Sequence, residues 1–151
     1  NSWIPETRNK KTMKYCAFLR GVNVNGTSMK MAEVCKVFEK AGMQNVSSIL
    51  ATGNILFSSD KNREEMKTIL ENAMSQHFDY EAFLFIKAKE EIETVFQNNP
   101  FEKSENAHVY VFVGIDGAED ILMEAFANGK KSEKIYAFWV KILANRVPYR
   151  V

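Results

Sequence analysis

Residues 15–42 read YCAFLRGVNVNGTSMKMAEVCKVFEKAG, and this stretch decides the fold of the first half of the chain. Together with Lys14, its beginning is rich in aromatic and apolar residues up to Gly21, which predicts a strand over 14–20. From Met31 onward, apolar residues recur every three or four positions, which predicts an amphipathic helix that ends at Gly42 as its C-cap. The recurring positions are Val34, Cys35, Phe38 and Ala41. A loop rich in glycine and asparagine therefore connects a strand to a helix.

The alternation of strands and helices continues downstream. Residues 46–50 and 54–59 predict the two strands of a hairpin that turns at Gly53. Residues 61–78 predict a second helix, whose apolar stripe consists of Met66, Ile69, Leu70, Ala73, Met74 and His77. Residues 81–88 predict another strand, and because it is apolar nearly throughout we expect it inside the sheet. The order β-α-β-β-α-β predicts an α+β fold with a ferredoxin-like unit, in which two helices cover one face of an antiparallel sheet.

The second half of the chain predicts a further, partial α/β unit packed against the first. Its expected elements are a helix over 89–99, a strand over 108–115, a helix over 118–129 and a strand over 133–139. The expected division is a leader or cloning remnant at 1–12, a ferredoxin-like subdomain at 13–88 and a second α+β subdomain at 89–151, incomplete at its C-terminal end. No long linker separates the two subdomains.

The composition describes an ordinary globular protein and excludes several classes. Hydrophobic residues make up 46% and charged residues 26%, and the net charge of +1 gives no global field for a nucleic acid or a membrane. No run of 18 apolar residues is present, and residues 1–12 lack the apolar centre of a signal peptide. Cys16 and Cys35 fall on apolar positions without metal-ligand spacing, so we expect reduced, buried thiols in a cytoplasmic protein.

The loop at residues 21–28 is close in spacing to a phosphate-binding P-loop, with Gly21, Gly26 and Ser28 in place. Thr27, however, stands where a P-loop needs lysine to meet the β- and γ-phosphates. No apolar strand ending in an aspartate follows to hold magnesium. The sequence therefore excludes an NTPase site.

A weaker anion site remains possible for this loop. Its backbone N–H groups would lie at the start of the helix, with Ser28 or Thr27 as N-cap and Arg20 and Lys30 on either side. The alternative is a simple connection, in which the glycines supply positive φ angles and the asparagines form local turns.

Two stretches, AFLRGVNVNGTSMKMAEV at 17–34 and FEKAGMQNVSSILATGNILFSS at 38–59, resemble the opening of the bacterial family named domain of unknown function 1697. The positions that carry the resemblance are Arg20, Gly21, Asn23, Gly26, Lys30, Met31, Gly53 and Asn54. The resemblance implies a small α+β protein without assigned catalytic residues, and it weakens after residue 59. Asn25 and Thr27 depart from the glycine and lysine common in the family. If the family loop binds an anion through that lysine, the resemblance implies weaker binding by this chain. The end of the chain lacks a Thr/Arg/Asn-rich motif of the family, so we expect part of the family sequence to be absent.

Other chemistry finds little support in the sequence. His77 and His108 share no metal-ligand spacing, so no metal or cofactor is expected. The carboxylates fall on first turns or exposed faces of the expected helices, and no nucleophile elbow occurs. Four strand aromatics, namely Phe83, Phe85, Tyr110 and Phe112, could stack single-stranded bases on a ferredoxin-like sheet. No pattern of RNA-recognition type accompanies them, and we expect them in the core.

The sequence therefore favours a non-enzymatic binding protein for an anionic small molecule or a nucleic-acid backbone. The expected ligand-binding residues are Arg20, Gly21, Asn23, Gly26, Ser28, Lys30, Thr52, Gly53 and Asn54. One alternative is an enzyme acting on a phosphorylated small molecule and completed by the absent C-terminal motif. Another is a self-associating module in which an uncovered sheet face makes a homodimer.

Overall fold

A computed structural model describes residues 11–22, 28–51, 53–99 and 101–102, together with residues 105, 114, 120, 121, 124, 125, 128, 138, 139, 149 and 150. The chain divides into two compact units, Asn1–Ala88 and Lys89–Val151.

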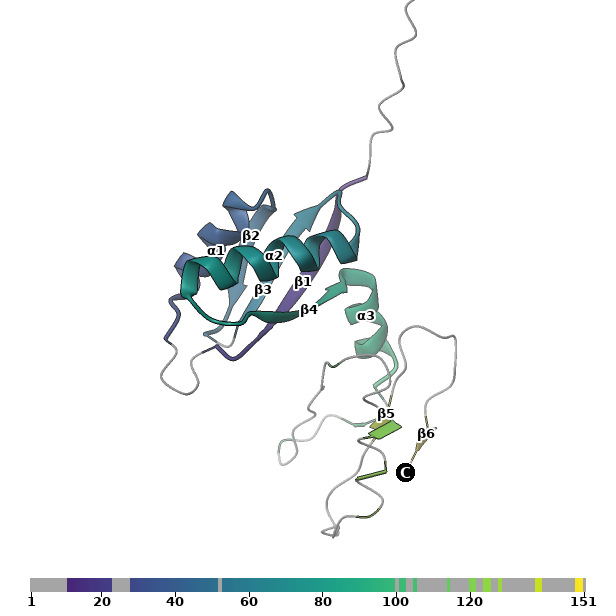
Figure 1. Ribbon diagram of the computed structural model, residues 1–151. Helices are drawn as coiled ribbons and strands as arrows, with labels where there is room; N and C mark the ends of the chain where they lie inside the picture. Colours follow the sequence, from purple (N-terminus) through teal and green to yellow (C-terminus); the bar gives the residue numbers. More distant parts are fainter. Residues whose placement is uncertain are drawn as a thin grey trace, which may run out of the picture. The chain divides into compact units, whose positions relative to one another are not determined.

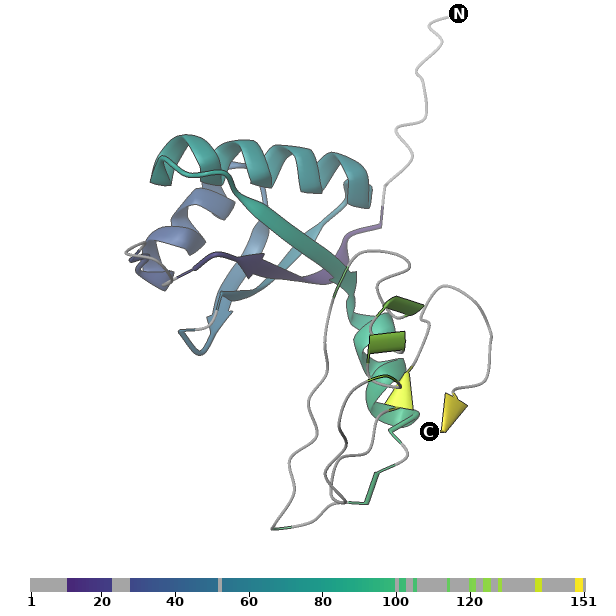
Figure 2. The same cartoon turned by 60° about the horizontal axis from the view of Figure 1, so that its bottom comes forward.

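The first unit is built on a four-stranded antiparallel sheet. Along the chain it contains β1 (Met13–Arg20), α1 (Met31–Lys40), β2 (Gln44–Ile49), β3 (Asn54–Ser59), α2 (Arg63–Phe78) and β4 (Phe83–Ala88). The strand order is β2-β3-β1-β4, and every pair of neighbouring strands is antiparallel. Both helices lie on the same side of the sheet (Figures 1 and 2). The predicted α+β class is confirmed.

The core of this unit fills the space between the sheet and the two helices. Alternate residues of β1 point into it, beginning with Tyr15, and Ile55 and Phe57 of β3 meet them from the neighbouring strand. From α1, Phe38 is fully buried and packs edge-to-face on Phe57, with ring centroids 5.7 Å apart. Burying a side chain of this size stabilises a fold by about 1.5–3 kcal/mol.

Helix α1 begins at Met31, where the apolar periodicity of the sequence starts, but its N-cap is not the residue expected. The N-cap residue is Lys30, whose side chain makes no capping hydrogen bond, and its carbonyl accepts from the N–H groups of Glu33 and Val34. The prediction of Ser28 as N-cap is wrong, because Ser28 and the buried Met29 precede the helix in non-helical backbone. At the other end, Ala41 is the C-cap, and Gly42 follows with φ +95°.

Helix α2 lies on the same side of the sheet as α1 and begins with a side-chain cap. The Asn62 side chain accepts a hydrogen bond of 2.9 Å from the N–H group of Glu65. Met66, Leu70 and Met74 are fully buried, as the apolar stripe predicts. His77, which was expected to lie on the same stripe, is exposed in the last turn.

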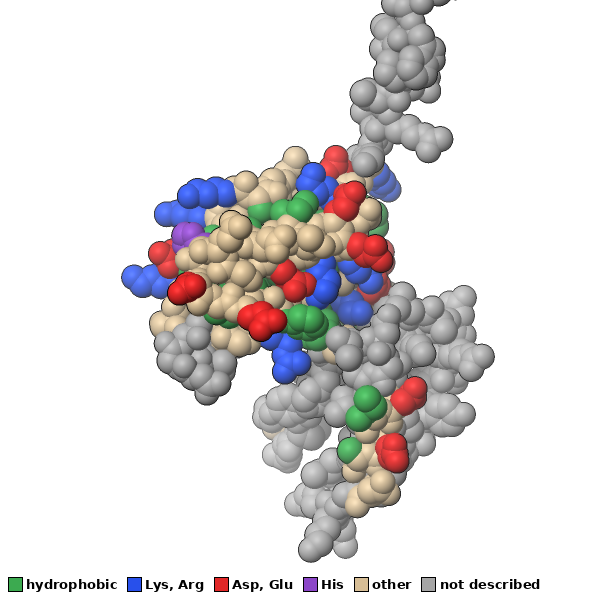
Figure 3. All heavy atoms as spheres, in the orientation of Figure 1, with side chains coloured by type: hydrophobic (Ala, Val, Ile, Leu, Met, Phe, Trp, Pro, Cys, Tyr) green, Lys and Arg blue, Asp and Glu red, His purple; other side chains and the backbone are tan. Residues whose placement is uncertain are grey.

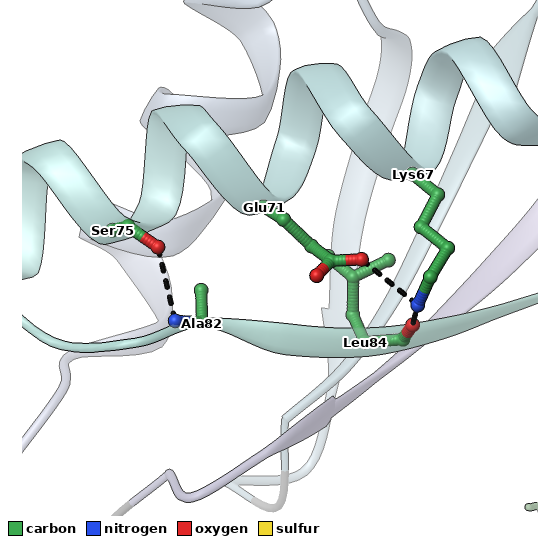
Figure 4. Close-up of polar contacts among 5 residues, drawn as sticks. All are labelled: Lys67, Glu71, Ser75, Ala82 and Leu84. Carbon is green, nitrogen blue, oxygen red and sulfur yellow. Dashed lines mark hydrogen bonds and ion pairs between the residues drawn. The ribbon is translucent and has the colours of Figure 1, made fainter.

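Strand β4 lies at an edge of the four-stranded sheet, so the prediction that it is internal is wrong. The apolar run has another cause: Leu84 and Ile86 face the core, whereas Phe83 and Phe85 occupy the other side. At the free edge, Lys67 Nζ donates to the carbonyl of Leu84 over 2.6 Å and pairs with a carboxylate oxygen of Glu71 at 2.8 Å (Figure 4). The backbone of β4 is also tied to α2 at its start, where the N–H group of Ala82 donates to Ser75 Oγ over 2.9 Å (Figure 4).

In the second unit, α3 (Lys89–Gln97) corresponds to the predicted helix at 89–99, and Phe96 is 75% exposed. Two short strands, β5 (Phe138–Trp139) and β6 (Tyr149–Arg150), pair antiparallel. The first of them coincides with the end of the strand expected at 133–139. Most of the strand expected at 108–115 and most of the helix expected at 118–129 lie outside the described residues.

Candidate functional site

The first unit presents a sheet face that α1 and α2 do not cover, which we call the opposite face. Strand register assigns its members, because residues directly paired across antiparallel strands point to the same side. Cys16 pairs with Leu56 and Lys87, and Phe18 pairs with Asn54 and Phe85. The opposite face consists of Lys14, Cys16, Phe18 and Arg20 of β1, Gln44, Ser47 and Ile49 of β2, Asn54, Leu56 and Ser58 of β3, and Phe83, Phe85 and Lys87 of β4.

The charge of this face has one sign. The four strands of the sheet contain neither aspartate nor glutamate, and their charged residues are Lys14, Arg20 and Lys87, all on the opposite face. Lys14 and Arg20 are exposed, and Lys87 is half-buried. By contrast, acidic and basic side chains are mixed on the side covered by α2 (Figure 3). The opposite face therefore has the electrostatic character of an anion-binding surface.

Large apolar side chains are exposed among these cations. Ile49, Leu56 and Phe83 retain 45%, 36% and 38% of their surface. Phe18 and Phe85 are half-buried, and neither belongs to the core cluster. The expectation that Phe83 and Phe85 lie in the core is therefore wrong. Tyr110 and Phe112 lie outside the described residues.

The end of this face at Arg20 adjoins the hairpin between β2 and β3. The N–H group of Leu19 donates to the carbonyl of Gly53 over 2.9 Å, and Gly53 adopts φ +83°. A side chain at Gly53 would lie 3.1 Å from Leu19 Cβ and 3.2 Å from Val22 Cγ2, so only glycine allows the hairpin to approach this closely. Val22, at the start of the first loop, therefore lies close to the hairpin.

Tyr80 brings a further polar group to this corner. Its ring lies 3.9 Å from the position that a Cβ atom would take at Gly21. Its hydroxyl is buried and has no hydrogen-bond partner among the described residues, and burial raises the pKa of Tyr80. A buried hydroxyl without a partner is unfavourable, and the Tyr80 side chain packs against the core cluster of the first unit.

The structure brings together some of the predicted site residues. Arg20 and Gly21 are exposed at the end of β1, Gly53 is buried beside them, and Asn54 is half-buried opposite Phe18. Ser28 and Lys30 are exposed at the start of α1. The remaining predicted residues, Asn23, Gly26 and Thr52, lie outside the described residues.

Other candidate sites carry less chemistry. Cys16 is buried as predicted, and this burial raises the pKa of its thiol to about 11, although the backbone of Ile55 partly offsets the effect. Cys35 is only half-buried, contrary to expectation, and burial again raises its pKa.

A depression on α2 is lined by Glu64, Glu65, Thr68 and Ile69, and its two carboxylates disfavour an anion. Within the described ranges, no group of three side chains could hold a metal ion, and no helix is long and apolar enough to span a bilayer.

Sequence reasoning missed the opposite face as a basic surface. The three cations are 6 or more positions apart along the chain or on different strands, so no charge cluster is visible in the sequence. The signal that could have revealed them is the scarcity of acidic residues in the four expected strands, where Glu81, at the start of the strand expected over 81–88, is the single one.

The fold and the basic sheet surface define a small α+β protein with a candidate binding face, and comparison with known proteins gives its family. Residues 13–139 match the family described as "Protein of unknown function (DUF1697)", and the chain belongs to this family. The match extends well beyond residue 59, where the resemblance in the sequence weakens. No curated protein sequence matches the chain. A similar solved structure is that of the conserved bacterial protein SP0830 from Streptococcus pneumoniae, with 21% identity and a TM-score of 0.70, covering 84% of this chain and 72% of that one.

Proposed function

We propose that the protein is a binding protein for an anionic ligand, which it holds on the opposite face of its first unit. One observation carries the proposal: every charged residue in the four strands is basic and lies on the opposite face, namely Lys14, Arg20 and Lys87. The helix-covered side lacks such segregation of charge. A surface of one sign attracts an oppositely charged ligand and raises its association rate.

We further infer that residues 13–88 form a ferredoxin-like unit. The strand order β2-β3-β1-β4, with antiparallel neighbours and both helices on one side, supports this assignment. In such a unit one sheet face is free of the unit's own helices, and this face is the natural place for a ligand. Arg20 and Asn54 are the residues of the opposite face that also belong to the site expected from the sequence.

Binding of a polyanion without bases tests this function. Inorganic polyphosphate should bind the full chain, and its affinity should fall by roughly tenfold or more between about 50 mM and about 200 mM salt, because three cations release counterions. Arg20→Glu should weaken binding strongly. The matched control is Lys36→Glu, which changes the net charge equally but lies exposed on α1, on the other side of the sheet.

Two outcomes would contradict the proposal. Salt-insensitive binding, or none, would remove the electrostatic basis of the site. Equal effects of Arg20→Glu and Lys36→Glu would show that only the net charge of the protein matters, and that the opposite face is not where the ligand lies.

A further inference from the structure

We propose that the ligand of the opposite face is a single-stranded nucleic acid whose bases stack on Phe18 and Phe85, an inference that rests on the proposed function. The two phenylalanines are direct partners across β1 and β4, so their side chains project from neighbouring positions of one sheet face. Both are half-buried and outside the core cluster. Aromatic rings in such positions offer flat surfaces on which any base can stack.

The three phenylalanines of this region are not equivalent. Phe83 packs edge-to-face on Phe85, with ring centroids 5.1 Å apart. Lys67 Nζ lies 4.0 Å from the ring centroid of Phe83 and 5.8 Å from that of Phe85, so the cation approaches Phe83 more closely and occupies one face of that ring. Phe83 therefore supports Phe85 from the side, and Phe18 and Phe85 are the rings for stacking.

The spread of the cations indicates an extended ligand. Lys14 and Arg20 stand 6 positions apart on β1, which corresponds to roughly 20 Å along a strand. A single phosphate or mononucleotide cannot reach both ends. Lys87 pairs with Cys16, between these ends, and so adds a third cation along the same path. A polymer with one negative charge per repeating unit matches this arrangement.

The chemistry of the surface favours a single strand over a duplex. In a duplex the base faces are covered by their neighbours, and aromatic side chains on a sheet cannot reach them. A single strand can place its bases on the rings while its phosphates meet lysine and arginine at the margins. A polyanion without bases would make no stacking contact with Phe18 or Phe85. This difference separates the inference from the proposed function.

The experiment measures the affinity of the full chain for oligonucleotides of about eight residues, a length within the range of single-strand binding sites. The probes are oligo(dT), oligo(U), an oligo(dT) in which every base is removed, and a duplex of equal length. The variants Phe18→Leu and Phe85→Leu remove a ring but keep an apolar side chain. Phe78→Leu, at the end of α2 on the helix side, is the matched control for any general loss of stability.

We expect Phe18→Leu and Phe85→Leu to weaken binding of the base-bearing single strands roughly 5- to 100-fold each. The control variant should bind like the wild-type protein, and the abasic strand and the duplex should bind more weakly and be insensitive to either substitution. Comparison of oligo(dT) with oligo(U) assigns the preference to DNA or RNA.

Equal affinity for abasic and base-bearing strands would overturn the inference while leaving the anion-binding function intact. Unchanged binding in both phenylalanine variants would do the same. Light scattering provides a further check. If the wild-type protein is a dimer that Phe18→Leu converts to a monomer, and no oligonucleotide binds, the inference is overturned in favour of self-association through this face. Failure of polyphosphate and of all oligonucleotides to bind would overturn the proposed function as well.

Discussion

At the scale of single residues, two glycines with positive φ differ in what surrounds them. Gly42 adopts φ +95° and would give an added Cβ no neighbour within 4 Å, whereas a Cβ at Gly53 would meet Leu19 and Val22 at 3.1–3.2 Å. We expect Gly42→Ala to lower the free energy of unfolding by about 1–2 kcal/mol through backbone strain alone. Gly53→Ala should lower it by clearly more, because steric overlap is added. Chemical denaturation of both variants measures the difference, and equal losses would contradict the close approach at Gly53.

Cys16 makes the stability of the protein depend on pH in the alkaline range. Burial raises the pKa of its thiol from 9.0 to about 11 in the folded state. The unfolded chain therefore loses this proton more readily, so the stabilising effect is complete below pH 9 and is lost as the pH rises toward 11. Relative to Cys16→Ala, the wild-type protein should lose about 1 kcal/mol of unfolding free energy between pH 8 and pH 10. Cys35 and Tyr80 titrate in both proteins, so parallel pH profiles would show that Cys16 is not protected.

At the scale of elements, Lys67 joins α2 to the exposed edge of β4. Its ammonium group contacts the Leu84 carbonyl at 2.6 Å, Glu71 at 2.8 Å and the Phe83 ring at 4.0 Å. A lysine at a free edge also discourages pairing with another strand. We expect Lys67→Met to lower the free energy of unfolding by about 1–2 kcal/mol and to increase aggregation. Lys36→Met, on the exposed side of α1, is the control, and equal effects of the two would contradict the role of Lys67.

The elements also show what a sequence can predict. Local signals were sufficient for β3 at Asn54–Ser59 and for the extent of α2 within two residues, because alternation and the spacing of Met66, Leu70 and Met74 are local properties. The N-cap of α1 was misplaced, since a serine that could cap a helix does not cap one here. The edge position of β4 was missed for a related reason. An apolar run looks the same whether both its faces are buried or one carries exposed phenylalanines.

The candidate site was predictable only in part, because it depends on the register between neighbouring strands. Arg20 and Gly53 were assigned to one candidate site because unusual residues concentrate in these loops, and the hydrogen bond from Leu19 to Gly53 joins the two segments. The row that contains Phe18, Asn54 and Phe85 depends on how three strands align. Cross-strand alignment follows from pairs of residues far apart in the chain, and the sequence of each strand alone does not contain it.

At the scale of the whole molecule, the core cluster of the described residues lies within the first unit, from Tyr15 to Ala88. No member of this cluster comes from the second unit, which begins at Lys89. A domain of this size buries only about 60% of the surface of its unfolded chain, yet many such domains fold alone. The described core of the first unit therefore forms without a side chain from the second unit.

We accordingly expect a fragment of residues 11–88 to fold cooperatively on its own. Its thermal midpoint should lie within about 10 °C of the first transition of the full chain, because a loss of about 1–2 kcal/mol in the free energy of unfolding shifts the midpoint of a domain of this size by roughly that amount. All residues of the opposite face lie in this fragment, so its affinity for polyphosphate and for oligonucleotides should stay within about threefold of the full chain. Circular dichroism and fluorescence anisotropy provide the two measurements.

A fragment that unfolds without a transition would show that the second unit completes the core. A folded fragment that binds neither probe, when the full chain binds both, would show that residues after Ala88 supply the ligand contacts and would move the site away from the opposite face.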